Sequence, residues 1–580
     1  MRTVIDVENQ AANRLGPGEP LSLTRFELLA SAVGGVARLR ELVLEFAIQG
    51  RLGPQDSSDE PASTVVAKAD VQKDSHGTKK PLPRQLNRRD SSALPVGWCW
   101  SSLGEIGMIS PRNAAPDEIQ ASFVQMSSIP VAMMEPHATE TRQWGDIKSG
   151  FTHFAEGDVG AAKITPCFEN GKSTVFRGLS NGIGAGTTEL HVVRPLAGVV
   201  PEYILAFLKS PRFLRNGEAV MTGSAGQKRM PRAYFESTPF PLPPLAEQHR
   251  IVTRVEELMK LCDALVENGR LADEQHARLV STLFDALASS ESSHELFENW
   301  QRLADHFDLL LDRPEAIDAL ERTVLQLAVS GLLVPQDHSD ELGRDLLNRM
   351  QRSRIARRNI IPPSSEAVES FSGSMPKSWA WASIDQISAD DERAITDGPF
   401  GANLKTEHYI DRPGYRIVRL QNIGRGEFRD EHRAYVEKAR FDELIKHQVL
   451  AGDLVVAGLI DTSIRCCVVP NGIGPAIVKA DCYRLSVHPL VSARYVLHYL
   501  NSATAHEFAA VHHHGLTLTR IGLGNFRSIP VPLPPLAEQH RIVARVDELR
   551  GLCVDLRGRL TETRDVQTAL ADALVADVLC

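Results

Sequence analysis

The twelve residues "PLPPLAEQHRIV" at Pro241–Val252 occur a second time, without a change, at Pro532–Val543. Identity over twelve positions is far beyond chance, so the chain contains an internal duplication. The copies are 291 residues apart. That distance is far longer than one repeat of a solenoid and has the size of a whole module. The string therefore marks the same place in two large modules.

Other strings repeat in the same order. "GRLGPQD" at Gly50–Asp56 matches "GLLVPQD" at Gly331–Asp337, and "LPVGWCW" at Leu94–Trp100 matches "MPKSWAW" at Met375–Trp381. Each half thus has an amphipathic segment, a polar linker, a tryptophan-containing string, a long varied stretch and then the twelve-residue string. The strings that flank the long stretches repeat, whereas the long stretches themselves, residues 95–240 and 376–531, differ in sequence. We call these two stretches the middles and the repeated segments around them the flanks.

The flanks have the pattern of helices. Pro244 suits a first helical position, and Glu247 in the first turn complements the helix dipole. Apolar residues then follow at alternating steps of four and three, as in a coiled-coil seam: Ile251, Val255, Leu258, Cys262 and Leu265 in one copy, and Ile542, Val546, Leu549, Cys553 and Leu556 in the other. The first helix is expected to run to about residue 289, and residues 26–50 and 307–331 predict a second helical pair. A helix packed only on its own domain is the alternative; two identically phased copies favour helices that pack on each other.

The middles contain short β-branched and aromatic runs broken by glycine, which favours a mixed α/β fold. The predicted organisation is an N-terminal helical segment and linker (1–94), a first domain (95–240), a central helical spacer and linker (241–375), a second domain (376–531) and a C-terminal helix (532–580). The polar stretches 53–93 and 338–374 are expected to be linkers with at most a short helix.

Composition excludes several classes of protein. No apolar run in the 580 residues approaches the roughly 20 needed to cross a bilayer, and the first residues lack a signal pattern, so a cytoplasmic protein is expected. The eight cysteines include no Cys-x-x-Cys pair, so no metal site is expected. "PCFENGKS" resembles a phosphate-binding loop but has Pro166 where the first glycine is required. With no methyltransferase or helicase motif either, we expect no catalysis by this chain.

The net charge of the chain favours nucleic-acid binding only when it is counted separately for each region. The net charge is -9, yet the first middle nets 0 and the second +1. Superposing the repeated strings places Arg229 over Arg520, where each middle returns to its helix. Basic clusters predict contacts with phosphates, and a solvated charged face is the alternative. The candidate DNA-binding residues are Lys209, Arg212, Arg215, Gln227, Lys228, Arg229 and Arg232 in the first middle, and Arg412, Arg416, Arg419, Arg425, Arg520 and Arg527 in the second.

The strings together resemble a known family. "LPVGWCWSSLGEI", "GDVGAAKITPCFENGK", "QKRMPRAYFESTPFPLPPLAEQHRIV", "DGPFGANLK" and "GNFRSIPVPLPPLAEQHRIV" are similar to the specificity subunit of type I restriction-modification enzymes, from about residue 22 onwards. The resemblance implies two α/β target-recognition domains, each reading half of a split DNA sequence. It also implies long antiparallel coiled-coil helices that separate the domains in a pseudo-two-fold repeat.

The resemblance also implies partners. The family's subunit is not an enzyme: it holds two methyltransferase subunits and works with motor-nuclease subunits, directing adenine methylation and ATP-dependent cleavage. S-adenosylmethionine, ATP and Mg would belong to those partners, and no cofactor to this chain. Residues 1–21 and the 53–93 linker depart from the pattern and have no assignment. The alternative is a coiled-coil scaffold with two protein-binding domains, which fits the acidic balance but leaves the basic clusters unexplained.

Overall fold

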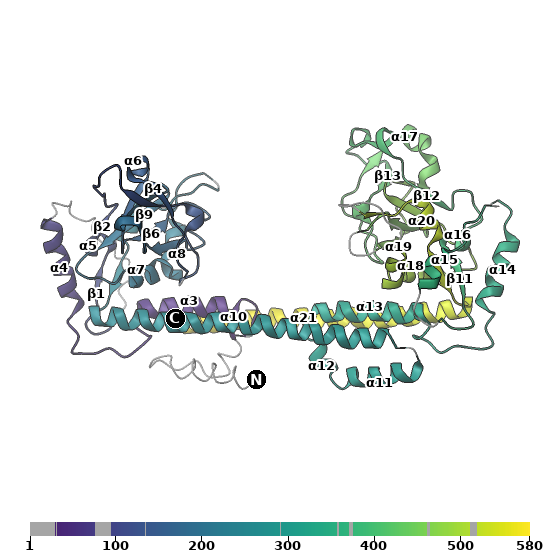
Figure 1. The fold of residues 1–580 in the computed structure, drawn as a ribbon, viewed down its shortest axis with the longest axis horizontal. Helices are drawn as coiled ribbons and strands as arrows, with labels where there is room; N and C mark the ends of the chain where they lie inside the picture. Colours follow the sequence, from purple (N-terminus) through teal and green to yellow (C-terminus); the bar gives the residue numbers. More distant parts are fainter. Residues whose placement is uncertain are drawn as a thin grey trace. The chain divides into compact units, whose positions relative to one another are not determined.

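The computed structural model describes residues 29–30, 32–75, 94–133, 135–224, 226–290, 292–356, 359–370, 375–460, 464–510 and 519–579. Residues 1–21 and the end of the first linker lie outside them. The chain divides into two compact units, one of residues 1–272 with 563–580 and one of residues 273–562. Each unit contains one α/β domain and part of both long helices (Figure 1).

Two four-stranded sheets form the centre of the first domain. One has the order β2 (Gly107–Ile109), β9 (Leu190–Pro195), β6 (Val159–Ala162), β7 (Ser173–Val175), with all neighbours antiparallel. The other has the order β4 (Glu140–Gln143), β3 (Gln120–Val124), β8 (Ile183–Gly186), β5 (Thr152–Ala155), with β3 and β8 parallel. Phe154 stacks on Phe176 with ring centroids 3.6 Å apart. Gly184 permits this packing, because a Cβ there would lie 2.3 Å from the Phe154 ring.

The second domain repeats this topology strand for strand. Its first sheet has the order β12 (Ile395–Asp397), β20 (Cys482–Leu485), β16 (Leu454–Ala457), β18 (Cys466–Val468). Its second sheet has the order β14 (Tyr435–Val436), β13 (Tyr415–Val418), β19 (Ala476–Val478), β15 (Gln448–Val449), and the parallel pair is again the central one, β13 with β19. The two middles, which differ in sequence, therefore share one fold.

A buried ion pair occupies the same place in both domains. Arg194 on β9 meets Asp158, the residue before β6, at 2.9 Å. Arg484 on β20 meets Asp453, the residue before β16, at 2.6 Å. Both carboxylates are nearly inaccessible to solvent, and breaking such a pair would leave an uncompensated buried charge. These pairs belong to the shared scaffold.

The long helices are α10 (Leu245–Ala288) and α21 (Leu536–Leu579), which begin and end close to the predicted positions. In the first unit, Ile251, Val255, Leu258 and Cys262 are buried in one core with α3 (Gly35–Gln49) and Ala571 of α21, and Leu265 packs against that core. In the second unit, Ile542, Val546 and Cys553 are buried in one core with α13 (Pro314–Ser330) and the end of α10, and Leu549 and Leu556 pack against it. The two seams thus belong to different cores. In each unit the seam of one long helix packs on the shorter helix of that unit and on the far end of the other long helix, so the two long helices pack on each other, as predicted.

The repeated string forms the junction of each domain with its long helix. Trp98 Nε1 donates to Glu247 Oε2 at 2.8 Å, and Gln55 Nε2 donates to Glu247 Oε1 at 3.2 Å. In the second unit Gln336 Nε2 donates to Glu538 Oε1 at 2.6 Å. Burial raises the pKa of both glutamates. The glutamate of the string therefore contacts the glutamine of the other repeated string, Pro-Gln-Asp.

The next residues of the string have matching partners as well. Gln248 accepts from the backbone N of Val200 at 2.9 Å, and Gln539 accepts from that of Ser492 at 2.8 Å. An ion pair joins Arg250 to Asp59 at 2.5 Å, and another joins Arg541 to Asp340 at 2.7 Å. The string has the same sequence in both copies because its side chains make the same contacts in each unit.

The linkers contain more structure than the sequence predicts. Residues 62–75 form α4 (Ala62–Ser75), whose Ala62, Val65 and Ala69 are buried and whose Lys73 Nζ donates to the carbonyl oxygens of Gly104 and Glu105. In the second linker α14 (Gly343–Ser353) buries Leu346 and Met350.

Within the described residues, no helix is both long enough and apolar enough to span a membrane.

Candidate nucleic-acid interface

Arg229 and Arg520 occupy equivalent positions in their domains. Arg229 forms an isolated bridge with Ile164, just after β6, and Arg520 on β21 (Thr519–Arg520) pairs with Leu459 on β17 (Leu459–Ile460), just after β16. Each guanidinium meets a carboxylate at 2.9 Å: Glu189, the residue before β9, or Asp481, the residue before β20. The hydrogen bond from Arg229 lowers the pKa of Glu189.

Both arginines remain partly accessible. The side chain of Arg229 is 45% exposed and that of Arg520 is 39% exposed. The guanidinium of Arg520 also lies 4.4 Å from the centroid of the Phe400 ring. A carboxylate that holds an arginine in one orientation leaves its outer N–H groups available to a second acceptor, as at many phosphate and base contacts.

Exposed polar residues surround Arg229. Gln227 and Lys228 are exposed beside it, and Arg232, the first residue of α9 (Arg232–Ser237), is exposed and 3.3 Å from Glu236. On α8 (Pro211–Ala219) Arg215 is exposed, with Nε donating to the carbonyl oxygen of Pro211, and Arg212 is partly buried. Five of the predicted residues, Gln227, Lys228, Arg229, Arg232 and Arg215, thus have exposed side chains.

Lys209 has a different role. Its ammonium group is buried and donates to the carbonyl oxygens of Pro130 at 3.2 Å, Val131 at 2.7 Å and Gly171 at 2.9 Å. Burial lowers its pKa to about 7. All three donors are engaged, so we leave Lys209 out of the proposed DNA surface and assign it to holding the chain after β3.

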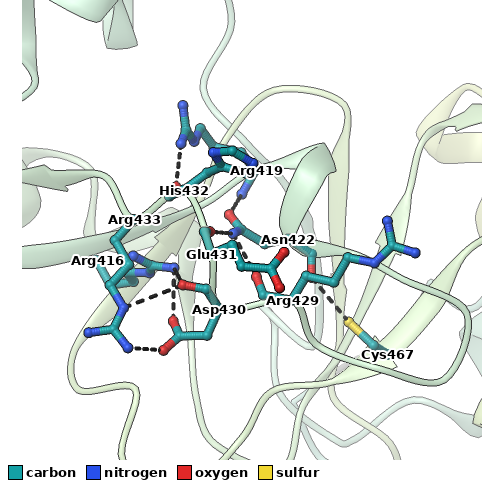
Figure 2. A network of polar contacts seen from close by, with 9 residues as sticks. All are labelled: Arg416, Arg419, Asn422, Arg429, Asp430, Glu431, His432, Arg433 and Cys467. Carbon is teal, nitrogen blue, oxygen red and sulfur yellow. Dashed lines mark hydrogen bonds and ion pairs between the residues drawn. The ribbon is translucent and has the colours of Figure 1, made fainter. Parts of the chain in front are cut away.

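In the second domain, Arg416 and Arg419 contact the loop that follows β13 (Figure 2). Arg416 has a side chain only 3% exposed, and it shares Asp430 with Arg433. Arg419 Nη2 donates to the carbonyl oxygen of His432, whose φ is +53°. A non-glycine residue in that region is uncommon and is held there by its surroundings. Both arginines therefore hold the loop, Arg416 from its buried side and Arg419 through the backbone of His432.

Asn422 is the residue of this network that sequence reasoning missed. It is fully buried, and its Nδ2 donates to the carbonyl oxygens of Arg429 at 2.9 Å and Glu431 at 3.0 Å, while its Oδ1 accepts from the backbone N of Arg419 at 3.0 Å (Figure 2). A single asparagine carries no signal in one sequence, because its importance comes from three backbone groups that only the fold brings together.

The remaining predicted residues of this domain are distributed differently. Arg412 is exposed and lies 2.5 Å from Glu437, and Arg425 is exposed in the loop after β13. Arg527 on α20 (Leu523–Ser528) instead grips the buried carboxylate of Asp385, with Nε–Oδ1 at 3.1 Å and Nη2–Oδ2 at 2.8 Å. This clamp places Arg527 in the scaffold, so we leave it out of the proposed DNA surface.

Among the described residues, no three histidine, cysteine, aspartate or glutamate side chains are arranged to hold a metal ion. The described cysteines are free thiols, five of them buried. Burial raises the pKa of Cys467 and of Cys482 to about 12, which disfavours the thiolate form that binds metals.

Comparison with known proteins identifies the family. A family model described as "Type I restriction modification DNA specificity domain" matches residues 459–563. The chain is 36% identical over 561 residues to the type I restriction enzyme EcoEI specificity subunit of Escherichia coli, with 93% of each chain covered. It is also 36% identical over 566 residues to the EcoAI specificity subunit of the same organism, again covering 93% of each. The crystal structure of the HsdS subunit from Thermoanaerobacter tengcongensis is similar at 17% identity and a TM-score of 0.40, over 84% of this chain and 98% of that one. On the identity to its two Escherichia coli relatives over nearly the whole length, the chain belongs to the family of type I restriction enzyme specificity subunits.

Proposed function

We propose that this chain recognises DNA for a type I restriction-modification complex and reads a target made of two half-sites, one with each domain. The observation that carries the proposal is the repeated topology with an accessible arginine at the same place, Arg229 in one domain and Arg520 in the other. Around these arginines the sequences of the two domains differ. One scaffold with two different surfaces suits a protein that reads two different sequences.

The chemistry of the complex is assigned to partner subunits. Two methyltransferase subunits would bind this chain and methylate adenine in the target, and motor-nuclease subunits would cleave DNA with ATP. S-adenosylmethionine, ATP and Mg would be bound by those subunits, and the complex would work in the cytoplasm. The exposed or partly exposed residues proposed to contact DNA are Arg212, Arg215, Gln227, Lys228, Arg229 and Arg232 in the first domain, and Arg412, Arg425 and Arg520 in the second.

A domain exchange tests the proposal. The chain is expressed with its methyltransferase subunit, and methylated adenines are mapped by sequencing. Residues 98–240 are then replaced by the corresponding region of the EcoEI specificity subunit. We expect one half of the mapped target to change and the other half to persist, because the Gln55–Glu247 and Gln336–Glu538 contacts of the two junctions lie outside the exchanged region. A change in both halves would contradict independent readers. A wild-type complex that selects no DNA sequence would favour the scaffold with protein-binding domains.

A further inference from the structure

The two domains differ sharply at one loop of their shared fold. In the first domain β3 leads through a turn at Met126–Ser128 into residues 130–139, "PVAMMEPHAT", which contain no lysine or arginine. In the second domain β13 leads through the equivalent turn at Leu420–Asn422 into Gly424–Arg433, "GRGEFRDEHR". We call Gly424–Arg433 the reading loop. It carries three arginines, whereas the first-domain loop carries none and is mostly apolar.

The backbone of the reading loop is held from inside the domain. Ile423 and Phe428 form a bridge, with the backbone N of Gly424 donating to the carbonyl oxygen of Glu427 at 2.9 Å. Arg465 Nη1 donates to the carbonyl oxygen of Ile423 at 3.1 Å. Together with the two bonds from Asn422, these contacts fix the loop's course while its charged side chains stay at the surface (Figure 2).

The first domain holds its equivalent loop by other means. There the buried ammonium group of Lys209 binds the carbonyl oxygens of Pro130 and Val131, and His137 Nε2 accepts from the backbone N of Arg177 at 3.1 Å. A loop that is held rigidly in both domains, and whose surface differs between them, has the properties expected of a specificity element. Functional contacts need such preorganised positions.

Arg429 is the cation of the reading loop with no partner among the described residues. Arg433 and the underlying Arg416 share Asp430, whereas the Arg429 guanidinium is exposed and forms no ion pair or hydrogen bond there (Figure 2). Both of its backbone polar groups are bound: its N donates to the carbonyl oxygen of Asn422, and its own carbonyl accepts from Asn422 Nδ2. The Arg429 side chain therefore extends from a fixed backbone position, and its guanidinium N–H groups are available to bind an acceptor on a ligand.

We infer that Arg429 reads a guanine in the half-site of the second domain, and that Asn422 is the positioning residue that sets its direction. An arginine fork matches the O6 and N7 acceptors of guanine in the major groove. This inference rests on the proposed DNA-recognition function and adds to it the residue and the base.

The test uses the full chain with its methyltransferase subunit and a fully randomised duplex DNA library, from which bound molecules are sequenced. We expect Arg429→Ala to lower the guanine preference at one position of one half-site by about tenfold or more, with the other half-site unchanged. Arg429→Lys should lose the same preference while retaining overall affinity, because lysine keeps the charge and lacks the fork. Lys438→Ala is the matched control: this exposed lysine of the same domain lies on α17 (Lys438–Glu443), is paired with Asp442, and should leave the preference unchanged.

The outcomes separate the inference from the function on which it rests. If the wild type enriches no sequence, the DNA-recognition function itself fails. If the wild type enriches a bipartite sequence and Arg429→Ala keeps every base preference, the inference is overturned. A uniform loss of affinity that Arg429→Lys restores overturns it too, since that behaviour belongs to a phosphate contact. Asn422→Ala should relax the same position as Arg429→Ala, and relaxation spread over the whole half-site would contradict a positioning role.

Discussion

At the scale of single residues, Arg229 and Arg520 give the most direct test of the proposed surface. Replacing either with alanine should weaken DNA binding by about 1 to 3 kcal/mol, with relaxed base preference if the arginine contacts guanine and a uniform loss if it contacts phosphate. Glu189→Gln and Asp481→Asn are the comparison variants: they keep the arginine and remove only its ion pair, so they should weaken DNA binding less than the alanine variants. Fluorescence titration on the wild-type target measures the effect. Unchanged affinity in both alanine variants would refute the assignment.

His191 makes the first unit sensitive to acid. It is buried against Phe235, with its ring centroid 5.3 Å away, and its Nε2 lies 3.1 Å from the carbonyl oxygen of Met230. Burial, with the nearby Lys163 and Arg232, lowers its pKa to about 4, against the opposing effects of the hydrogen bond to Met230 and of Glu189. The unfolded chain takes up this proton first, at about pH 6.5. The contribution of His191 to the free energy of unfolding is therefore complete above about pH 6.5. It falls as the pH drops toward 4, by up to about 3 kcal/mol.

The variant His191→Gln tests this pH dependence. Glutamine can still donate to the carbonyl oxygen of Met230 but does not titrate. The midpoint of thermal unfolding should therefore fall less between pH 6.5 and pH 4 in the variant than in the wild type. Equal slopes in the two proteins would show that His191 does not control the acid response.

The residue scale is also where sequence reasoning stops. The clusters of basic residues were visible, but Lys209, Arg416 and Arg527 are largely buried within them. A charge count cannot distinguish a cation that faces solvent from one that binds three backbone carbonyls. Asn422 was invisible for the same reason, because its partners are separated from it by up to nine residues and meet it only after folding.

At the scale of elements, the junction between domain and helix depends on Glu247. Glu247→Ala would leave the buried indole N–H of Trp98 without its acceptor, which costs about 1 to 3 kcal/mol, and would remove one of the two acceptors of the Gln55 amide. Glu247→Gln keeps one of the two acceptor oxygens and avoids burying a charge, so its loss of stability should be smaller than that of Glu247→Ala. Thermal unfolding, with hydrogen exchange of the amides of β1 (Cys99–Ser101), measures both variants. A wild-type midpoint for Glu247→Ala would contradict this role.

Repetition explains which elements could be predicted. The helices and junctions follow from strings such as "PLPPLAEQHRIV", since identical structural tasks keep identical residues. The α/β class of the middles followed from short β-branched runs, but their common topology did not. Two sheets can preserve strand order with different side chains as long as buried positions stay apolar and pairs such as Asp158–Arg194 and Asp453–Arg484 persist. Helix α4 was missed because its apolar residues are few and small.

At the scale of the whole molecule, each unit is completed by the far end of the other unit's long helix. In the first unit Ala571 is buried with the seam of α10, Val575 packs against the same core, and Asp572 pairs with Arg38 at 2.5 Å. In the second unit Val280, Phe284 and Leu287 are buried with the seam of α21. The shift of 291 residues that aligns the repeated strings places Val280 over Ala571 and Phe284 over Val575. The end of α10 and the end of α21 therefore perform the same task in different units.

This equivalence predicts a dimer from half of the chain. A fragment of residues 1–331 keeps one domain and all of α10 but lacks residues 563–580, so its first-unit core is left open. A second copy can close it with Val280, Phe284 and Leu287, each worth roughly 1.5 to 3 kcal/mol when fully buried. Closed two-fold pairing would give two identical readers, so with the methyltransferase subunit the fragment should direct methylation to an inverted repeat of the first half-site. Light scattering over a concentration series and methylation mapping measure both properties. Phe284→Asp in the fragment should give monomers that direct no methylation, whereas a well-folded wild-type monomer, or methylated sites that are not inverted repeats, would contradict the pseudo-symmetric architecture.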